Sequence, residues 1–255
     1  MPPFVTHILK TYRLELLVVV LALLARVLYL EMSLAAVGDL NTTIEGSDYF
    51  FVIAQNILEG HGYSSDTESP YTLNSVRPPI MPYFLAGAHT LFGGWGGVIA
   101  LYLLIGSLIP LIGMRLARYL VYSRPVVGVV GLFLALEPFG ILFSTIFYSE
   151  TLFIALFLCS VLCLFRYFDS HRWLDLVVSA GLLGAATLTK PVVQYLPVLI
   201  VALLLWEARK RFGAAAVLRA AVYGLVCMAV IAPWVYRNYA EFGAAGISSQ
   251  STVNF

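Results

Sequence analysis

Residues 14–36 read LELLVVVLALLARVLYLEMSLAA, a stretch that is apolar over almost its whole length. A helix needs about 20 such residues to cross the hydrocarbon core of a bilayer. Further stretches of similar composition lie at 97–121, 125–146, 150–167, 174–189, 191–207 and 215–236. The sequence therefore predicts an all-α polytopic membrane protein with about seven transmembrane helices.

The composition of the 255 residues excludes several classes of protein. Hydrophobic residues make up 60% and charged residues only 11%, which is far from the balance of a soluble globular domain. The 15 basic and 14 acidic residues leave a net charge of +1, so nucleic acid is not an expected partner. The cysteines Cys159, Cys163 and Cys227 lie inside apolar runs without a metal-binding spacing, so neither disulfides nor a metal site are expected.

The distribution of basic residues predicts the orientation of the spans. With seven spans, most basic residues share the side of the N-terminus, which the positive-inside rule assigns to the cytoplasm. Arg77, Lys190 and Arg237 fall on the opposite, extracytoplasmic side. An eighth span at 80–92 would move most of the later basic residues outside, so this short stretch is not expected to cross. The residues on the cytoplasmic side are Lys10, Arg13, Arg115, Arg118, Arg124, Arg166, Arg172, Arg209, Lys210, Arg211 and Arg219.

The outer loop at about 37–96 is too long for a passive connector, since structureless loops beyond about 15 residues are uncommon in compact proteins. Its stretch 47–60 begins with Ser47 and Asp48, carries apolar residues at helical spacing, and ends on Gly60. This pattern predicts an amphipathic helix at the membrane surface, and residues 78–92 predict a second one. Without repeats or a break in composition, residues 1–255 are expected to form one module.

Two carboxylates on the outer side are candidate site residues. Asp48 begins the first loop helix and Glu150 begins a span, so either could simply stabilise the free N–H groups of a helix start. The alternative is that Asp48 is a general base and that Glu150 faces the same pocket. Glu137, which precedes a proline inside a span, is assigned no role.

The three outer cations, Arg77, Lys190 and Arg237, each lie beside a proline or an aromatic residue. Long cationic side chains at helix ends can simply extend into the interface. Together the three could instead hold a phosphate, because arginine offers paired donors and lysine a point charge.

Several stretches occur in an order that resembles the GT-C-type integral-membrane glycosyltransferases. The closest resemblance is to the group of the dolichyl-phosphate-mannose protein mannosyltransferases and the lipid A aminoarabinose transferase. The stretches are GSDY at 46–49, AQNILEGHGY at 54–63, RPPIMPYFLA at 77–86, SETLF at 149–153, GLLGAATLTKP at 181–191 and APWVYRNY at 232–239.

This resemblance implies a seven-span module whose first outer loop carries two juxtamembrane helices and a catalytic aspartate, at Asp48. It implies an inverting transfer of a monosaccharide from a polyprenyl-phosphate donor to a hydroxyl of a protein, lipid A or a cell-wall glycolipid. Arg77, Lys190 and Arg237 would hold the donor phosphate, and Glu150 would be a second acidic residue. No cofactor is implied, and a divalent cation remains an open alternative.

The resemblance also implies a multi-pass protein of the cell's inner membrane with its site on the extracytoplasmic side. Members of the group are commonly longer, so the chain could be an N-terminal fragment. The alternatives are a polyprenyl-lipid transporter or flippase and an inactive membrane scaffold. A transporter predicts inverted repeats and broken helices near the membrane midplane. The sequence indicates neither, and its charges lie at one face.

Overall fold

A computed structural model describes residues 12–46, 48–211 and 214–249, which form helices and no strand. The chain divides into two compact units. Unit 1 comprises Met1–Phe51 and Leu85–Leu158, and unit 2 comprises Val52–Phe84 and Cys159–Phe255. Ser47, which was expected to help begin the first loop helix, lies outside the described residues. The assignment of the whole chain to a single module stays a prediction.

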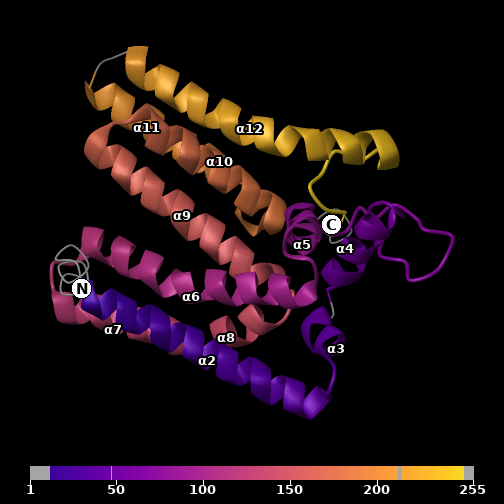
Figure 1. The fold of residues 1–255 in the computed structure, drawn as a ribbon. Helices are drawn as coiled ribbons and strands as arrows, with labels where there is room; N and C mark the ends of the chain where they lie inside the picture. Colours follow the sequence, from indigo (N-terminus) through magenta and orange to yellow (C-terminus); the bar gives the residue numbers. More distant parts are fainter. Residues whose placement is uncertain (1–11, 47, 212–213, 250–255) are drawn as a thin grey trace. The chain divides into compact units, whose positions relative to one another are not determined.

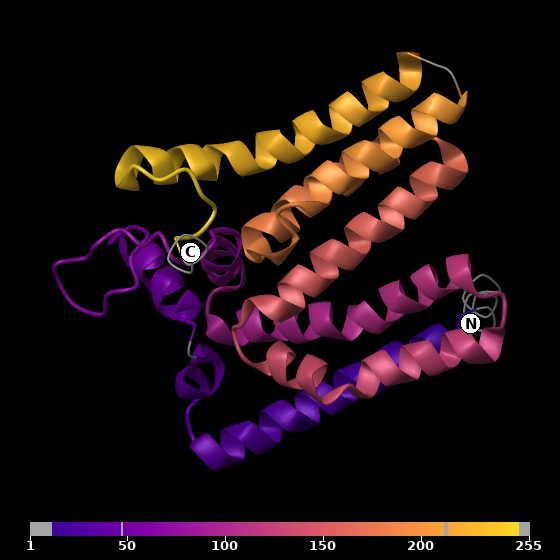
Figure 2. The ribbon, with the colours of Figure 1, turned by 180° about the vertical axis from the view of Figure 1, so that it is seen from behind.

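Unit 1 is built on three long apolar helices that run side by side (Figures 1 and 2). They are α2 (Arg13–Val37), α6 (Trp95–Leu120) and α7 (Arg124–Leu136). The short helices α3 (Leu40–Glu45) and α8 (Pro138–Thr145) follow α2 and α7 along the chain. Val18 and Ala22 of α2 pack with Met114 of α6 and with Val127 and Ala135 of α7. Small residues at this contact allow the helix backbones to approach closely, as is usual between membrane helices.

The helix pair α7 and α8 is broken at Glu137 and Pro138, where the helix axis bends by 46°. Proline has no N–H group and cannot continue the helical hydrogen bonds. The Glu137 carboxylate compensates, because it accepts hydrogen bonds from the backbone N–H groups of Phe139, at 2.9 Å, and of Gly140. Glu137 therefore caps α8, a role that its position before a proline left open.

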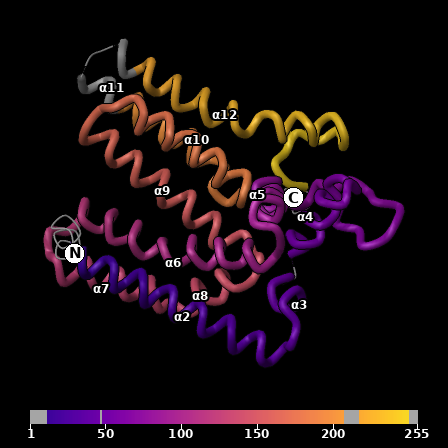
Figure 3. The backbone as a smooth tube through the Cα atoms, in the orientation of Figure 1, coloured from indigo at the N-terminus to yellow at the C-terminus, as the bar shows by residue number. Residues whose placement is uncertain are grey.

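Unit 2 contains α10 (Trp173–Thr189), the 3-10 turn η1 (Pro191–Val193), α11 (Leu196–Arg211) and α12 (Ala214–Phe242). In Figure 3, α10 and α11 both lie along α12, and these are the main helix contacts of the unit. Three further helices cross the boundary between the units along the chain: α4 (Phe50–Glu59), α5 (Ile80–Phe92) and α9 (Ser149–Ser170).

Four of the described helices are long and apolar enough to cross a membrane, and the bent pair α7 and α8 can form a fifth span. They correspond to α2, α6, α9 and residues 217–242 of α12. The remaining expected spans, 174–189 and 191–207, correspond to shorter apolar helices. The all-helical, multi-pass architecture is confirmed, and the count of seven stays a prediction. Helices are present at 50–59 and 80–92, and their location at the membrane surface also stays a prediction.

The loop between α4 and α5 is ordered by its own polar side chains. Buried Asn56 donates hydrogen bonds to the carbonyl oxygens of Ser64, at 2.8 Å, and of Asp66, at 2.9 Å. The Asp66 carboxylate accepts from the hydroxyl and the backbone N–H of Thr72, at 2.6 and 2.7 Å. These hydrogen bonds hold the pKa of Asp66 below its ordinary value.

Acidification is therefore expected to loosen this loop. Because the pKa of Asp66 is lower in the folded loop, its contribution to stability is present above the unfolded pKa of about 3.9 and is lost as the pH falls below it. Hydrogen exchange at Thr72, corrected for the intrinsic rate, should show protection at pH 6 that declines below about pH 4. Asp66→Asn should remove this pH dependence and the matched variant Glu68→Gln should keep it; an unchanged profile in Asp66→Asn would refute the assignment.

Candidate active site

The chain segments that carry Asp48 and Glu150 lie side by side in unit 1. The backbone N–H of Phe147 donates to the carbonyl oxygen of Ile44 at 2.8 Å. The Tyr148 ring lies against Gly46, where a Cβ atom would be 3.4 Å from Cε2 of the ring. Asp48 follows Gly46 by two residues, and Glu150 follows Tyr148 by two. The two contacts therefore hold the backbone before Asp48 next to the backbone before Glu150.

The backbone beside Asp48 is unusual. Gly46 and Tyr49 adopt positive φ angles of 65° and 62°, and such a conformation costs energy for a residue with a side chain such as tyrosine. The turn is followed at once by α4, whose Phe51 packs on Trp95 and Phe147 with ring centroids 4.6 and 6.1 Å apart. Asp48 itself is half-buried. A strained turn anchored by aromatic packing therefore presents this carboxylate.

Glu150 lies in the first turn of α9 and is half-buried. The residues before and after it in the sequence are held by hydrogen bonds. The Tyr102 hydroxyl donates to the carbonyl oxygen of Tyr148, and the Thr151 hydroxyl donates to that of Phe143 at 2.8 Å. The start of α9, which carries Glu150, is therefore held by hydrogen bonds to α6 and α8.

Arg26 is a residue that the sequence analysis missed. It is only 1% exposed and lies inside the apolar stretch of α2. Its guanidinium donates to the Ser144 hydroxyl at 3.1 Å and to the carbonyl oxygens of Ala22 and Ala135 at 3.0 and 3.2 Å. The Ser144 oxygen in turn lies 3.5 Å from the hydroxyl oxygen of Thr151. The signal was available, because a charge inside a span is by default a functional candidate.

Arg237 occupies an aromatic box in unit 2. Its guanidinium carbon lies 4.7, 5.0 and 5.5 Å from the ring centroids of Trp234, Phe242 and Tyr63. Its Nη1 donates to the carbonyl oxygen of Asn74 and to Oδ1 of Asn238, both at 2.8 Å. Its Nη2 is buried and has no hydrogen-bond partner among the described residues. A buried cationic donor without an acceptor is costly, which makes Nη2 a candidate ligand-binding group.

Arg77 is linked to the same place through its backbone. Oδ1 of Asn74 accepts from the N–H of Arg77 at 2.9 Å, while the Asn74 carbonyl accepts from Arg237. The Tyr63 hydroxyl donates to the carbonyl oxygens of Arg77 and Pro78 at 3.0 and 2.9 Å. Burial raises the pKa of this phenol far above its ordinary value, so it stays a neutral donor.

The segment after α12 is hydrogen-bonded to the loop that precedes Arg77 and to Trp234. The backbone N–H of Ser249 donates to the carbonyl oxygen of Ser75 at 3.0 Å, and the Ser248 hydroxyl donates to that of Val76. Nε1 of Trp234 donates to the carbonyl oxygen of Ile247 at 3.0 Å. The loop that precedes Arg77 is thus fastened to the helix that carries Arg237.

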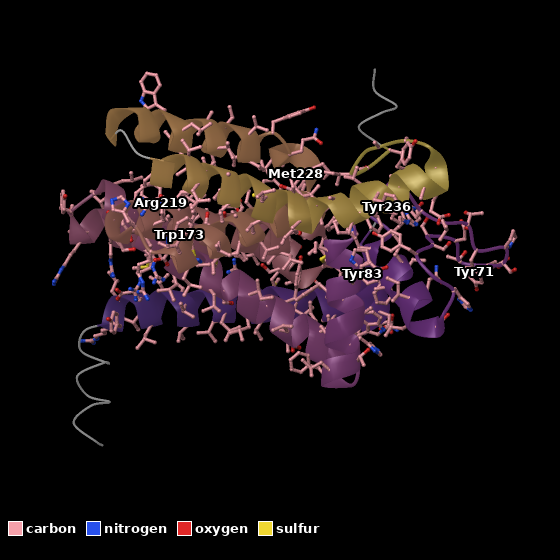
Figure 4. The ribbon with its side chains drawn as sticks, turned by 90° about the horizontal axis from the view of Figure 1, so that it is seen from above. Tyr71, Tyr83, Trp173, Arg219, Met228 and Tyr236 are labelled. Carbon is pink, nitrogen blue, oxygen red and sulfur yellow. The ribbon has the colours of Figure 1, made fainter. Side chains whose placement is uncertain are left out.

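Lys190 is the residue that caps the C-terminal end of α10, and its backbone N–H donates to the carbonyl oxygen of Ala186 at 2.9 Å. Two residues earlier, Leu188 packs in a buried cluster with Ile53, Tyr63, Ile231, Trp234 and Ile247. The structure therefore places the segments of all three expected cations around one cluster of unit 2. Figure 4 shows Tyr83 and Tyr236 at this end of the unit, and Trp173 and Arg219 toward the other end.

Across residues 12–46, 48–211 and 214–249, no group of three or more His, Cys, Asp or Glu side chains is placed to hold a metal ion. His61 stacks on Tyr71 with ring centroids 4.0 Å apart, and His89 packs on Trp95 at 4.5 Å. The absence of a cofactor from the reaction stays a prediction.

Comparison with known proteins adds one finding. A family model described as dolichyl-phosphate-mannose-protein mannosyltransferase matches residues 76–236. The matched region includes Arg77, Glu150 and Lys190, whereas Asp48 and Arg237 lie outside it. Neither the curated proteins nor the solved structures gave a match. Because the family model covers more than half of the chain, this protein belongs to the dolichyl-phosphate-mannose-protein mannosyltransferase family, a family of membrane glycosyltransferases of the GT-C type.

Proposed function

We propose that the protein transfers a monosaccharide from a polyprenyl-phosphate-linked donor to an acceptor hydroxyl, with inversion, on the extracytoplasmic side of the inner membrane. Membership of the family supports a glycosyltransferase of the membrane. The observation that carries the proposed donor is Nη2 of Arg237, a buried cationic donor without an acceptor among the described residues. A phosphate oxygen would satisfy it with a charge-assisted hydrogen bond.

The donor phosphate is assigned to unit 2. Arg237 would bind one phosphate oxygen through Nη2, while its Nη1 stays on Asn74 and Asn238 and the Trp234 ring holds the guanidinium plane. Arg77 and Lys190, whose segments meet the same cluster, would supply the remaining positive charge. Arginine held in this way loses little conformational entropy when it binds phosphate.

The proton transfer is assigned to unit 1. The Asp48 carboxylate would accept the proton of the acceptor hydroxyl while that oxygen bonds to the anomeric carbon from the face opposite the phosphate. The bond between the anomeric carbon and the phosphate oxygen breaks, and its electron pair leaves with polyprenyl phosphate. Because negative charge grows on the leaving phosphate, the cations stabilise the transition state more than the bound donor. Glu150 is assigned to the acceptor side as a second carboxylate.

Substitution of Arg237 tests the donor assignment. In nanodiscs with polyprenyl-phosphate mannose and a membrane extract as acceptor source, Arg237→Gln should lower kcat/KM for polyprenyl phosphate release by about 10- to 100-fold, since a hydrogen bond to a charged group is lost. Arg237→Lys should restore part of the rate because the charge returns.

Arg219→Gln is the matched control. Arg219 lies on the same helix, its guanidinium carbon is 5.6 Å from the Trp173 ring, and it also has a buried nitrogen without a partner among the described residues. Its loss should leave the rate close to wild type. Equal losses in both variants would overturn the assignment of the phosphate to Arg237, and movement of the intact donor across the bilayer without release would favour a transporter.

A further inference from the structure

A cavity of about 750 Å³ lies in unit 1, and none of the candidate active-site residues lines it. Its lining comes from the first residues of α2 and α7 and the last residues of α6, which meet at one end of this unit (Figure 2). We refer to it as the cationic cavity because Arg13, Arg118 and Arg124 line it together with a single acidic residue, Glu15. Nothing in the proposed sugar transfer uses these residues.

The charges of the cationic cavity are not balanced. Arg118 forms an ion pair with Glu15, whose side chain is 7% exposed, so the only carboxylate of the lining is already neutralised. Arg13 and Arg124 are exposed and make no hydrogen bond or ion pair with any residue in the described ranges. Two arginines therefore face a hollow with no counter-anion from the described part of the chain.

The backbone adds to the positive potential. Helices α2 and α7, of 25 and 13 residues, begin at Arg13 and Arg124. The residues before them, Tyr12 and Ser123, make no side-chain capping hydrogen bond. Uncapped N–H groups at a helix start carry partial positive charge and favour an anion nearby. In α2 the Glu15 carboxylate already accepts a hydrogen bond from a backbone N–H of the first turn, so it is the arginines and the start of α7 that favour the same kind of ligand.

The other walls of the cationic cavity are apolar. Leu14 and Leu17 of α2 line it and are 45% and 58% exposed, and Val121 and Val127 line it as well. α2 is also one of the helices long and apolar enough to cross a membrane. A ligand that matches both the arginines and the apolar walls of the cavity needs an anionic phosphate and a hydrocarbon chain.

We propose that the cationic cavity binds an anionic phospholipid, with the headgroup phosphate at Arg13 and Arg124 and an acyl chain along the apolar start of α2. The positive-inside distribution of charge assigns this end of unit 1 to the cytoplasmic leaflet. Basic pockets between membrane helices on that side commonly hold anionic headgroups. The site is independent of the proposed sugar transfer and would hold if that proposal failed.

Native mass spectrometry of the full chain in detergent, titrated with phosphatidylglycerol, tests the proposal. The wild type should bind one phosphatidylglycerol saturably and should bind phosphatidylcholine weakly. The double variant Arg13→Gln/Arg124→Gln should raise the Kd for phosphatidylglycerol by about 30-fold. Both arginines are exposed, so their loss should not impair folding, and an unchanged elution profile checks this.

Three comparisons make the test decisive. Glu15→Gln should tighten binding, because it releases Arg118 from its carboxylate, whereas general damage to the fold would weaken binding. Arg172→Gln, which removes an exposed arginine of unit 2 assigned to the same leaflet, should change the Kd little. Sodium phosphate should compete only at much higher concentration. The proposal is overturned if the double variant binds like the wild type, if phosphatidylcholine binds equally well, or if inorganic phosphate binds as tightly as the lipid.

Discussion

Asp48→Asn is expected to lower the rate of sugar transfer by about 10²- to 10⁴-fold, the usual contribution of a general base. Asparagine has the same shape, so the anchored turn with Tyr49 and Phe51 should survive the change. The chemistry would be lost, because the amide cannot accept the proton of the acceptor hydroxyl. Single-turnover release of polyprenyl phosphate from polyprenyl-phosphate mannose, measured in nanodiscs with acceptor extract, gives the rate.

This variant also separates the two interpretations of Asp48. Asparagine caps a helix about as well as aspartate, so a carboxylate that only stabilised the start of α4 would be replaced without loss of activity. Asp39→Asn is the matched control, since Asp39 caps α3 through a hydrogen bond of 2.8 Å from the backbone N–H of Thr42. Wild-type rates in both variants would show that Asp48 is a cap and that the base is another group.

Arg26→Met is expected to lower the free energy of unfolding by about 3 kcal/mol. The side chains are of similar length, but methionine cannot donate to the Ala135 carbonyl, which the end of α7 leaves without a helical partner. The change also removes a cation that interacts electrostatically with the Glu137 carboxylate. Unfolding in mixed micelles of dodecyl sulfate and dodecyl maltoside, followed by tryptophan fluorescence, measures the loss.

A second pair of variants checks that the effect belongs to this network. A Cβ atom at Gly106 would lie 2.3 Å from Oγ of Ser144 and 3.0 Å from Nε of Arg26, so Gly106→Ala should also destabilise the protein. At Gly181, another helical glycine, no atom lies within 4 Å of the added Cβ, and Gly181→Ala should be tolerated. If Arg26→Met unfolded at the same dodecyl sulfate fraction as wild type, the network would not stabilise the fold.

Sequence patterns predicted the parts of this fold that depend on local composition. The length of the apolar stretches gave the helices at 13–37, 95–120 and 149–170, and Pro138 marked the point at which a span bends. The ends of α4 followed from a polar start and from Gly60, whose φ of 82° suits glycine. Each of these signals acts within a few residues of the feature it predicts.

The arrangement of polar groups could not be predicted in the same way. Arg26 bonds to Ser144 and Ala135, more than 100 positions away, and no local pattern encodes which helix an intramembrane arginine will meet. Asn74 was likewise unremarkable in the sequence, although it links Arg77 to Arg237. Such contacts depend on which helices become neighbours, and this is determined by packing.

The hydrogen bonds between the loop that precedes Arg77 and the segment after α12 have a consequence for the order in which the protein is made. Asn74 and Arg237 are separated by 163 positions, and Ser75 and Ser249 by 174. A ribosome releases the N-terminal part first, so the loop before Arg77 is synthesised long before its partners exist. During synthesis, the polar groups of this loop cannot make these hydrogen bonds until α12 and the residues after it exist. The candidate phosphate-binding arginines can therefore be brought together only after α12 has been synthesised.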